Sequence, residues 1–365
     1  MQKETHFFLG ANTPAGFTSL YSALVDPYTD DTLYIIKGGP GCGKSSFMAH
    51  IAGEIADTGL DVEHIHCTAD PDSLDAIYIP ALKIAYVDGG HPHVMEARYP
   101  AVMEQYLNLG EFYDVDALKP KKSEIIATNR TYKALYARAY DCIAAAHGII
   151  REVADYIVDD DVIAAVKKRT KGIISREIGK KRGGTGTITR RFLSALTCQG
   201  YVSRFDTVAA LATRVYHLDN TLGLAHHMLT DLSEAAVAAG LDCILCPAPL
   251  NPDRAAHLFI PALSLAFISS DYLAQYDGPA YRHIRLDAMA DGERLRGYKA
   301  KLRFLKKIFG ILIGEAVSTL AEAKAVHDEL EGIYNPHVDF DGVYRLAKRH
   351  VDGLLSQLTS QERSD

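Results

Sequence analysis

A glycine-rich segment near the N-terminus carries the clearest chemical signal in the sequence. Gly38 and the triplet Gly43-Lys44-Ser45 match the pattern G-x-x-x-x-G-K-[ST]. Glycines let successive backbone N–H groups converge on phosphate oxygens, because no Cβ stands in the way. In such a loop the lysine bridges the β- and γ-phosphates of a nucleoside triphosphate and the serine hydroxyl ligates Mg²⁺. The segment predicts binding of ATP with Mg²⁺ by Gly38, Gly39, Pro40, Gly41, Cys42, Gly43, Lys44, Ser45 and Ser46.

The residues on either side of this segment predict the elements that hold it. Residues 32–36 are apolar and β-branched, as expected of a buried parallel strand. Phe47, Ile51 and Ile55 then recur at helical spacing, and Gly59 marks the end of the helix. A strand, a loop and a helix in this order direct the positive end of the helix dipole at the bound phosphates.

A carboxylate at the end of a second strand is the expected partner for the cation. Residues 82–88 form an apolar run that ends in Asp88, which is the form of a Walker B strand. Ligands of open α/β sheets bind at the carboxyl ends of the strands. We therefore expect Ser45 and Asp88 to hold Mg²⁺ together. His91 and His93 follow in the next loop and are candidates for contact with phosphate or substrate.

The chain contains a second copy of this unit, which serves as an internal control. Residues 8–17 resemble residues 192–201, and residues 59–82 correspond to residues 240–263 at a constant offset of 181. At that offset Lys44 falls on Ala225 and Asp88 falls on Ser269. The second copy has therefore lost the phosphate-binding residues and the carboxylate, which supports Asp88 as the partner of Lys44.

The same comparison separates shared scaffold residues from candidates for function. Acidic residues and a histidine are found only in the first copy, namely Glu63, His66, Asp70 and Asp75. They follow the second predicted strand, near the expected phosphate site. Glu63 or Asp70 could orient an attacking water or a substrate hydroxyl, which makes Lys44, Asp88, Glu63 and Asp70 the candidate catalytic set. The alternative for each carboxylate is a solvated loop position.

Taken together, these segments resemble a little-characterised family of bacterial tandem P-loop ATPases. The resemblance rests on the GKS loop, on the residues from Glu63 to Asp75 and from Asp88 to Val94, and on the C-terminal helix around His327 to Glu331. It implies a P-loop NTPase fold and ATP binding, and it names no substrate. In that family the second unit usually has another GKS loop, which is absent here, so the second nucleotide site is expected to be lost.

The predicted fold is α/β, with parallel sheets flanked by helices and two tandem homologous units that each carry a helical extension. We expect an active unit over residues 1–165, a basic glycine-containing linker over residues 166–187, and a degenerate unit with C-terminal helices over residues 188–365. A pseudo-dimer of the two units within one chain would bury the interface that one unit cannot bury alone. The length of 365 residues is ample for two domains.

Composition narrows the class of partner and the compartment. The net charge of −7 argues against a general nucleic-acid binder. The basic stretch from Lys167 to Arg191 is the place where a nucleic acid or acidic partner could still bind, although a solvated connector is the favoured interpretation. The six cysteines are scattered, no signal peptide is visible, and the apolar runs are too short to span a membrane. We expect a cytoplasmic protein with no membrane partner, and no partner protein can be named.

Three functions are compatible with these residues. The first is Mg²⁺-dependent ATP hydrolysis at one site in the N-terminal unit. The second is a nucleotide or small-molecule kinase that uses the same loop with an acceptor base such as Glu63 or Asp70. The third is an interaction module in which the bound nucleotide orders a surface for a partner. ATP and GTP are not distinguished by any motif in the sequence.

Overall fold

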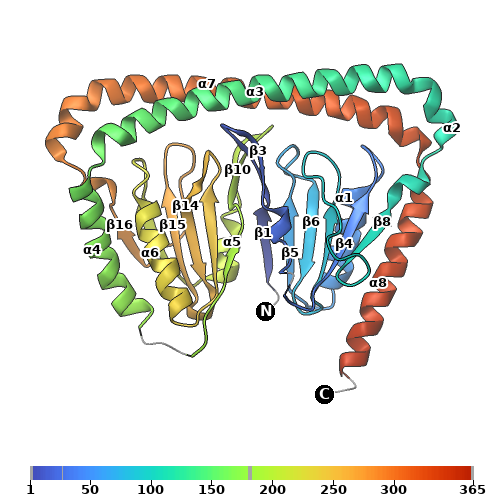
Figure 1. Ribbon diagram of the computed structural model, residues 1–365, viewed down its shortest axis with the longest axis horizontal. Helices are drawn as coiled ribbons and strands as arrows, with labels where there is room; N and C mark the ends of the chain where they lie inside the picture. Colours follow the sequence, from blue (N-terminus) through green and yellow to red (C-terminus); the bar gives the residue numbers. More distant parts are fainter. Residues whose placement is uncertain (1–2, 27, 180–182, 363–365) are drawn as a thin grey trace.

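Two α/β units lie side by side beneath a pair of long helices in the computed structural model, which describes residues 3–26, 28–179 and 183–362 (Figure 1). The first unit is a six-stranded sheet in the order β1-β5-β6-β7-β4-β8. Its strands are β1 (Glu4–Phe8), β4 (Thr32–Lys37), β5 (Val62–His66), β6 (Leu74–Ile79), β7 (Ile84–Asp88) and β8 (Glu104–Asn108), with helix α1 (Lys44–Ala56). The predicted strand–loop–helix over residues 32–56 is thus present in the structure.

The sheet is mixed, so the predicted parallel pairing holds for only some of its strands. Strand β6 runs antiparallel to both β5 and β7, whereas β4 pairs in parallel with β7 and β8. The reason is the length of the connections. Only short loops join β5 to β6 and β6 to β7, and a parallel crossover needs a dozen or more residues.

The second unit repeats the first strand for strand. Its sheet has the order β16-β12-β15-β14-β13-β9, which is the first order read from the other edge. The strands are β9 (Ile188–Arg190), β12 (Arg214–Asp219), β13 (Cys243–Ala248), β14 (Asn251–Ile260), β15 (Leu265–Ser270) and β16 (Arg282–Ile284), with helices α5 (Asp206–Leu211) and α6 (Ala225–Ala238). The repeat found in the sequence therefore corresponds to two units of one topology.

Equivalent residues of the two units meet between β1 and β9. Phe8 and Phe192 exchange backbone hydrogen bonds of 2.8 and 2.9 Å, and their side chains form a small buried cluster with Ala11 and Ala195. Beside them lie two hairpins, β2 (Gly10–Thr13) with β3 (Gly16–Ser19) and β10 (Ser194–Thr197) with β11 (Gly200–Ser203). Contact between the same residues of each copy is what a pseudo-dimer within one chain requires.

Two long helices span both units, and each places the helix that follows it on the opposite unit. Helix α3 (Lys122–Ile157) runs alongside α7 (Gly292–Tyr334) over the whole width of the molecule (Figure 1). As a result α4 (Asp160–Glu177) packs on α6 of the second unit, while α8 (Phe340–Glu362) packs on α1 of the first unit. The remaining short helices are η1 (Tyr21–Ala23), η2 (Leu109–Phe112), α2 (Val115–Leu118), η3 (Lys119–Lys121), η4 (Pro261–Leu263), η5 (Asp287–Met289) and η6 (Asn335–His337).

The spacing of apolar residues explains where α8 and α4 pack. Helix α8 presents Val343, Ala347, Val351 and Leu354 at steps of three and four residues, and all four are buried in one cluster with residues of α1. Val162, Val166 and Ile173 of α4 are buried in the same way against α6. Each unit is therefore completed by a helix from the other half of the chain.

This exchange revises the predicted division of the chain at residues 166–187. Residues 166–177 belong to α4, so the basic run that begins at Lys167 lies on a helix rather than in a linker. The predicted Lys180, Lys181 and Arg182 fall outside the described residues. Boundaries drawn at 1–165 and 188–365 also separate α8 from the unit that it covers, because helix exchange places neighbours in space far apart in sequence.

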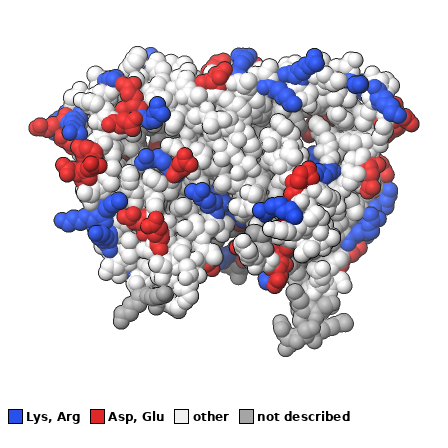
Figure 2. Space-filling model, in the orientation of Figure 1, with Lys and Arg blue, Asp and Glu red and all other residues white. Residues whose placement is uncertain are grey.

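The distribution of surface charge and the apolar character of the helices can be compared with the predicted partners. Basic and acidic side chains are interspersed over the face drawn in Figure 2. Within the basic stretch Arg190 is exposed, but Arg191 is only 3% exposed and is not available to a partner. Among the helices of the described residues, none combines the length and the apolar character needed to cross a membrane.

A buried ion pair joins the two units. Arg191 Nε lies 2.7 Å from Glu63 Oε1, and the same guanidinium donates to the carbonyl oxygens of Ala23 and Leu24. Removing one partner of a buried pair leaves an uncompensated charge, which costs more than losing the pair itself.

We predict that Arg191→Met lowers the free energy of unfolding by about 1–3 kcal/mol, because the half-buried Glu63 loses its counter-ion and the carbonyl oxygens of Ala23 and Leu24 lose a donor. Chemical denaturation followed by far-UV circular dichroism measures the change. Arg190→Met is the matched control, since Arg190 is exposed, and a change within about 0.5 kcal/mol is expected there. Glu63→Gln combined with Arg191→Met should recover part of the loss. Equal stability of the two single arginine variants would contradict the role of the pair.

Candidate functional site

The glycine-rich loop, residues 38–46, connects the carboxyl end of β4 to the start of α1. Gly41 and Gly43 have φ angles of +67° and +85°, which residues with a Cβ rarely adopt. A side chain at Gly41 would also collide with Asn335. The glycines are therefore required by the path of the loop, and α1 begins directly after Gly43 with its N–H groups facing the loop.

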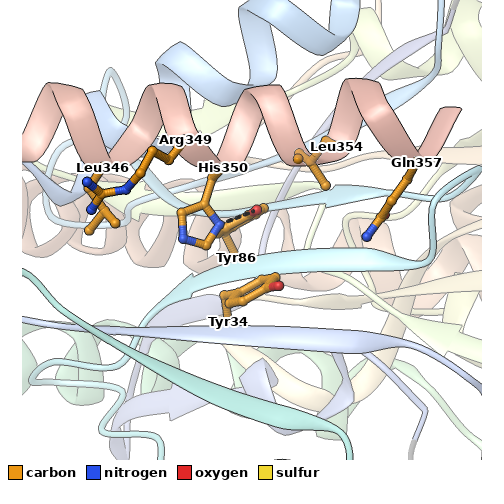
Figure 3. Close-up of a pocket in the computed structure, with 8 residues that line it drawn as sticks. Tyr34, Tyr86, Leu346, Arg349, His350, Leu354 and Gln357 are labelled. Carbon is orange, nitrogen blue, oxygen red and sulfur yellow. Dashed lines mark hydrogen bonds between the residues drawn. The ribbon is translucent and has the colours of Figure 1, made fainter. Parts of the chain in front are cut away.

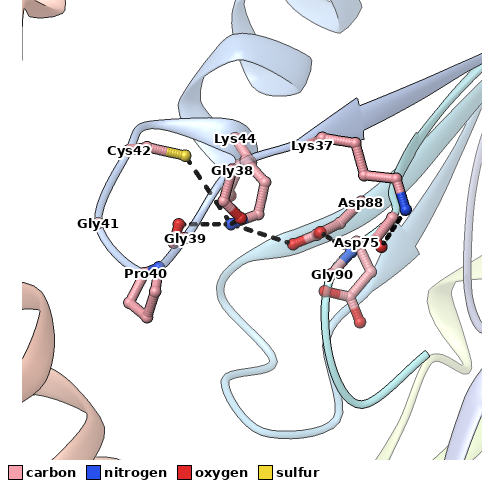
Figure 4. A network of polar contacts seen from close by, with 12 residues as sticks. Lys37, Gly38, Gly39, Pro40, Gly41, Cys42, Lys44, Asp75, Asp88 and Gly90 are labelled. Carbon is pink, nitrogen blue, oxygen red and sulfur yellow. Dashed lines mark hydrogen bonds and ion pairs between the residues drawn. The ribbon is translucent and has the colours of Figure 1, made fainter. Parts of the chain in front are cut away.

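Lys44 is folded back over this loop. Its Nζ donates to the carbonyl oxygens of Gly38 and Gly39 at 3.2 and 2.8 Å and lies 3.6 Å from Asp88 Oδ2 (Figure 4). Burial by itself lowers the pKa of Lys44, but the neighbouring Asp88 carboxylate, Cys42 and Glu331 together outweigh it, so the pKa of Lys44 is raised. Lys44 is therefore a charged ammonium at neutral pH.

Asp88 reaches Lys44 because of the order of the strands. It is the last residue of β7, which pairs in parallel with β4, and its backbone lies opposite Ile36. Asp88 Oδ1 accepts a hydrogen bond of 2.7 Å from the Gly90 N–H, which fixes the carboxylate at the end of the sheet. The two residues that the sequence paired, Lys44 and Asp88, are neighbours in the structure.

The remaining loop side chains have different surroundings. Ser45 Oγ accepts a hydrogen bond of 2.9 Å from the Leu74 N–H, so its hydroxyl proton and a second lone pair face the site. Ser46 is exposed. Cys42 is fully buried, and burial raises the pKa of its thiol. Cys42 therefore acts as a small packed residue rather than as a reactive thiolate.

A cavity of about 610 Å³ opens over the glycine-rich loop. The loop and the carboxylates Asp70, Asp75 and Asp88 form one side of it. Helices α3 and α7 form the other side, with the basic side chains Lys133 and Lys324. A cavity of this size, lined by backbone N–H groups and charged side chains of both signs, suits a polar ligand with several charges.

The last turns of α7 touch the loop directly. Glu331 Oε1 accepts a hydrogen bond of 3.2 Å from the Gly41 N–H, and the Asn335 amide, oriented to suit its neighbours, donates to the Gly41 carbonyl at 2.8 Å. Tyr113 adds a hydrogen bond of 2.8 Å to the Pro40 carbonyl. The sequence pattern assigned no role to Glu331 or Asn335, because these residues are some 290 positions away and only the path of α7 brings them to the loop.

Of the other predicted candidates, Asp70 and Asp75 lie at the cavity. Asp70 accepts a hydrogen bond of 3.0 Å from Ser73 Oγ, and its Oδ2 lies 3.4 Å from Lys324 Nζ. Asp75 is almost fully buried and accepts a hydrogen bond of 2.6 Å from the Tyr21 hydroxyl. Burial, reinforced by the nearby Asp88, raises the pKa of Asp75.

Glu63 and His66 lie away from the cavity, so the expectation that Glu63 orients a water or substrate there is not supported. Glu63 faces the second unit, where it pairs with Arg191. His66 Nδ1 lies 2.9 Å from the Pro71 carbonyl and is also approached by Arg204 of the second unit. Both residues are specific to the first copy because they form the contact between the units.

The equivalent loop of the second unit is filled by the protein itself. Asp287 accepts hydrogen bonds from the N–H groups of Thr221 and Leu222 at 2.9 and 3.1 Å. Asn220 Oδ1 accepts from the Ala225 N–H at 2.8 Å. Side chains of the chain thus occupy the donors that a phosphate would need, which agrees with the expected loss of the second site.

A second, smaller hollow of about 240 Å³ lies where α8 crosses the first sheet (Figure 3). Tyr34 and Tyr86 stack at its floor with ring centroids 4.8 Å apart, and the Tyr86 hydroxyl lies 3.1 Å from His350 Nδ1. Its lining carries little charge apart from Arg349. The hollow results from the packing of α8 on the sheet. It shares no lining residue with the cavity over the glycine-rich loop.

Comparison of the chain with models of protein families, with curated proteins and with solved structures gave no match. Any assignment of function therefore rests on the geometry of the site.

His66 gives the contact between the units a dependence on pH. Burial, with the guanidinium of Arg204 nearby, lowers the pKa of His66 to about 3. The unfolded chain binds a proton on this ring below about pH 6.5, whereas the folded chain does not until the pH approaches 3. Stability contributed by neutral His66 is therefore complete above pH 6.5 and is lost as the pH falls toward 3.

We predict that His66→Gln makes the free energy of unfolding fall less steeply between pH 6.5 and 4. The difference in slope should approach about 1.4 kcal/mol per pH unit, the value for one proton. Glutamine retains a donor for the Pro71 carbonyl, so a general loss of packing is avoided. Denaturant titrations of both proteins at several pH values measure the slopes, and parallel curves would show that His66 is not the group responsible.

Proposed function

We propose that the protein binds a nucleoside triphosphate with Mg²⁺ at the glycine-rich loop and hydrolyses it slowly, as an ATPase with one active site. The observation that carries the proposal is the position of Lys44, at the start of α1, within 3.6 Å of Asp88 on the adjacent parallel strand. A charged amine, a carboxylate and a helix N-terminus here line one cavity. This combination suits the phosphates and the cation of one ligand.

The difference between the two units supports the same proposal. In the second unit Asp287 and Asn220 satisfy the loop N–H groups from within the chain. In the first unit the corresponding loop has glycine conformations and opens onto the cavity. A loop that lines a cavity in one copy and is closed by local contacts in the other is expected when only one copy has an external ligand.

The residues available for Mg²⁺ are Ser45 and Asp88. Both offer oxygen atoms, the ligand type that Mg²⁺ prefers, and both line the cavity beside the loop. The ion would supply neutralisation of charge on the phosphate oxygens. Ser45 retains a free lone pair for this purpose, since its other contact is with the Leu74 N–H.

Lys44 changes partners when the phosphates bind. Its amine releases the carbonyl oxygens of Gly38 and Gly39 and takes up oxygens of the β- and γ-phosphates, where it stabilises the charge on the transferred group. The loop N–H groups bind the β-phosphate, and Asp88 holds the amine in position. Asp70 stands at the cavity wall as the nearest of the predicted candidates for orienting the attacking water.

A nucleotide-gated interaction module is the second candidate, favoured by the contacts of α7 with the loop. Glu331 accepts from the Gly41 N–H, the kind of donor that a phosphate oxygen requires. Binding of a triphosphate displaces this carboxylate and shifts the end of α7, one of the two long helices that span both units. The kinase alternative is favoured by no specific contact at the cavity.

Lys44→Ala should weaken binding of ATP by roughly tenfold to hundredfold, since a hydrogen bond to a charged group contributes about 1.5–3 kcal/mol. Isothermal titration calorimetry with ATP and GTP in the presence of Mg²⁺ measures the affinity, and phosphate release measures turnover. Lys119→Ala is the control, because Lys119 is exposed and pairs only with Asp116 in its own turn. If the parent protein binds neither nucleotide, the proposal fails.

Glu331→Gln should strengthen binding of ATP several-fold. The change removes a negative charge beside the phosphates and weakens the acceptor that competes for the Gly41 N–H. Glu329→Gln is the matched control, because Glu329 lies on the same helix and its side chain is exposed. Titration calorimetry compares the three proteins, and weaker binding by Glu331→Gln would mean that Glu331 assists the ligand rather than competing with it.

A further inference from the structure

His93 is a buried histidine without a hydrogen-bond partner. It is 5% exposed, and among the described residues neither Nδ1 nor Nε2 has a donor or acceptor within reach. Its ring stacks on Tyr21 with centroids 4.1 Å apart and planes inclined by 13°. Leaving a buried polar group unsatisfied costs about 1–3 kcal/mol, so two such atoms in one ring call for an explanation.

The imidazole of His93 faces two carboxylates. One ligand atom each of His93, Asp75 and Asp88 lie within 4.8 Å of one another. Ligands on opposite sides of an ion bound at about 2.1 Å are about 4.2 Å apart, so small movements of the side chains bring all three into range. The cluster also lines the cavity over the glycine-rich loop, which gives an ion a path to it.

The two carboxylates lie close together without a cation among the described residues to balance both. Asp88 is 3.6 Å from the Lys44 amine, but the polar contacts of Asp75 are the Tyr21 hydroxyl and the thiol of Cys67. Figure 4 shows Asp75 and Asp88 side by side at the ends of their strands.

The second unit lacks every member of this cluster. At the offset of 181 residues Asp75, Asp88 and His93 correspond to Ala256, Ser269 and Ala274. Tyr21, whose hydroxyl orients Asp75, corresponds to Phe205 in the segment that aligns at the offset of 184 residues. Three ligand positions and the hydroxyl that supports one of them thus differ together. The strands that carry Asp75 and Asp88 nevertheless follow the same order in both sheets.

We propose that Asp75, Asp88 and His93 bind a divalent transition-metal ion directly, in the absence of nucleotide. One imidazole nitrogen with two carboxylate oxygens favours ions such as Mn²⁺, Fe²⁺ or Zn²⁺ over Mg²⁺, which prefers oxygen ligands and retains its water. The Tyr21 hydroxyl holds Asp75 in orientation from behind. Asp88 is shared with the nucleotide site, so the ion lies next to the phosphates without depending on them.

The test is metal binding by the full chain after treatment with a chelator and without nucleotide. Electron paramagnetic resonance with Mn²⁺ as the probe measures stoichiometry and affinity, and pulsed measurements detect the nitrogen of a bound imidazole. We expect one Mn²⁺ per chain, a nitrogen signal, and no displacement by Mg²⁺ at equal concentration. His93→Gln should weaken binding at least tenfold and abolish the nitrogen signal.

Two further variants keep the test decisive. Asp75→Asn is nearly isosteric, retains an acceptor for Tyr21, and should also weaken binding of Mn²⁺ at least tenfold. His147→Gln, on α3 outside the cluster, is the control and should bind as the parent does. Equal affinity of the parent and His93→Gln, or bound Mn²⁺ without a nitrogen signal, would overturn the proposal. Lys44→Ala separates it from the proposed function. The variant removes a phosphate contact and a positive charge beside Asp88 but no metal ligand, so affinity for ATP should fall while bound Mn²⁺ and its nitrogen signal are retained.

Discussion

The packing of α3 against α7 is the contact on which the arrangement of the whole chain depends. Each of these helices begins over one unit and ends over the other, so each carries the chain across (Figure 1). The helix that follows α3 covers the second unit, and the helix that follows α7 covers the first. Neither sheet would have its outer helix if the long pair separated, because the apolar residues of α4 and α8 are buried only after the crossing.

This crossing also explains why a degenerate second unit is retained. The last turns of α7 bring Glu331 and Asn335 to Gly41, so the wall of the first-unit cavity is built by the second half of the chain. The second unit in turn fixes where α7 starts. A unit without the GKS residues is thereby still needed to position groups at the cavity of the other unit.

Charge is balanced differently at the two equivalent sites. In the second unit Asp287 satisfies the loop N–H groups and no lysine is present, so the loop is closed by local contacts. In the first unit Lys44 faces Asp88, with Asp75 and the unpartnered His93 close behind. Such a collection of charged and unsatisfied groups is costly in an empty cavity and is typical of a site that is shaped for ligands.

Local features were predictable from the sequence because they depend on neighbours along the chain. Glycine spacing, the apolar residues of β4 and the helical period of α1 predicted the loop and its flanking elements, and the run that ends at Asp88 predicted the strand beside Lys44. The repeat predicted two units of one topology.

Tertiary structure decided the rest. Glu63 was assigned to the site although its strand turns it toward Arg191 of the other unit. The resemblance included the helix around Glu331, but no local pattern placed Glu331 or Asn335 at the loop, because helix exchange brings them there from far along the chain. The sequence could place His93 after a strand, but only its burial and its distances to Asp75 and Asp88 set it apart from an ordinary loop histidine.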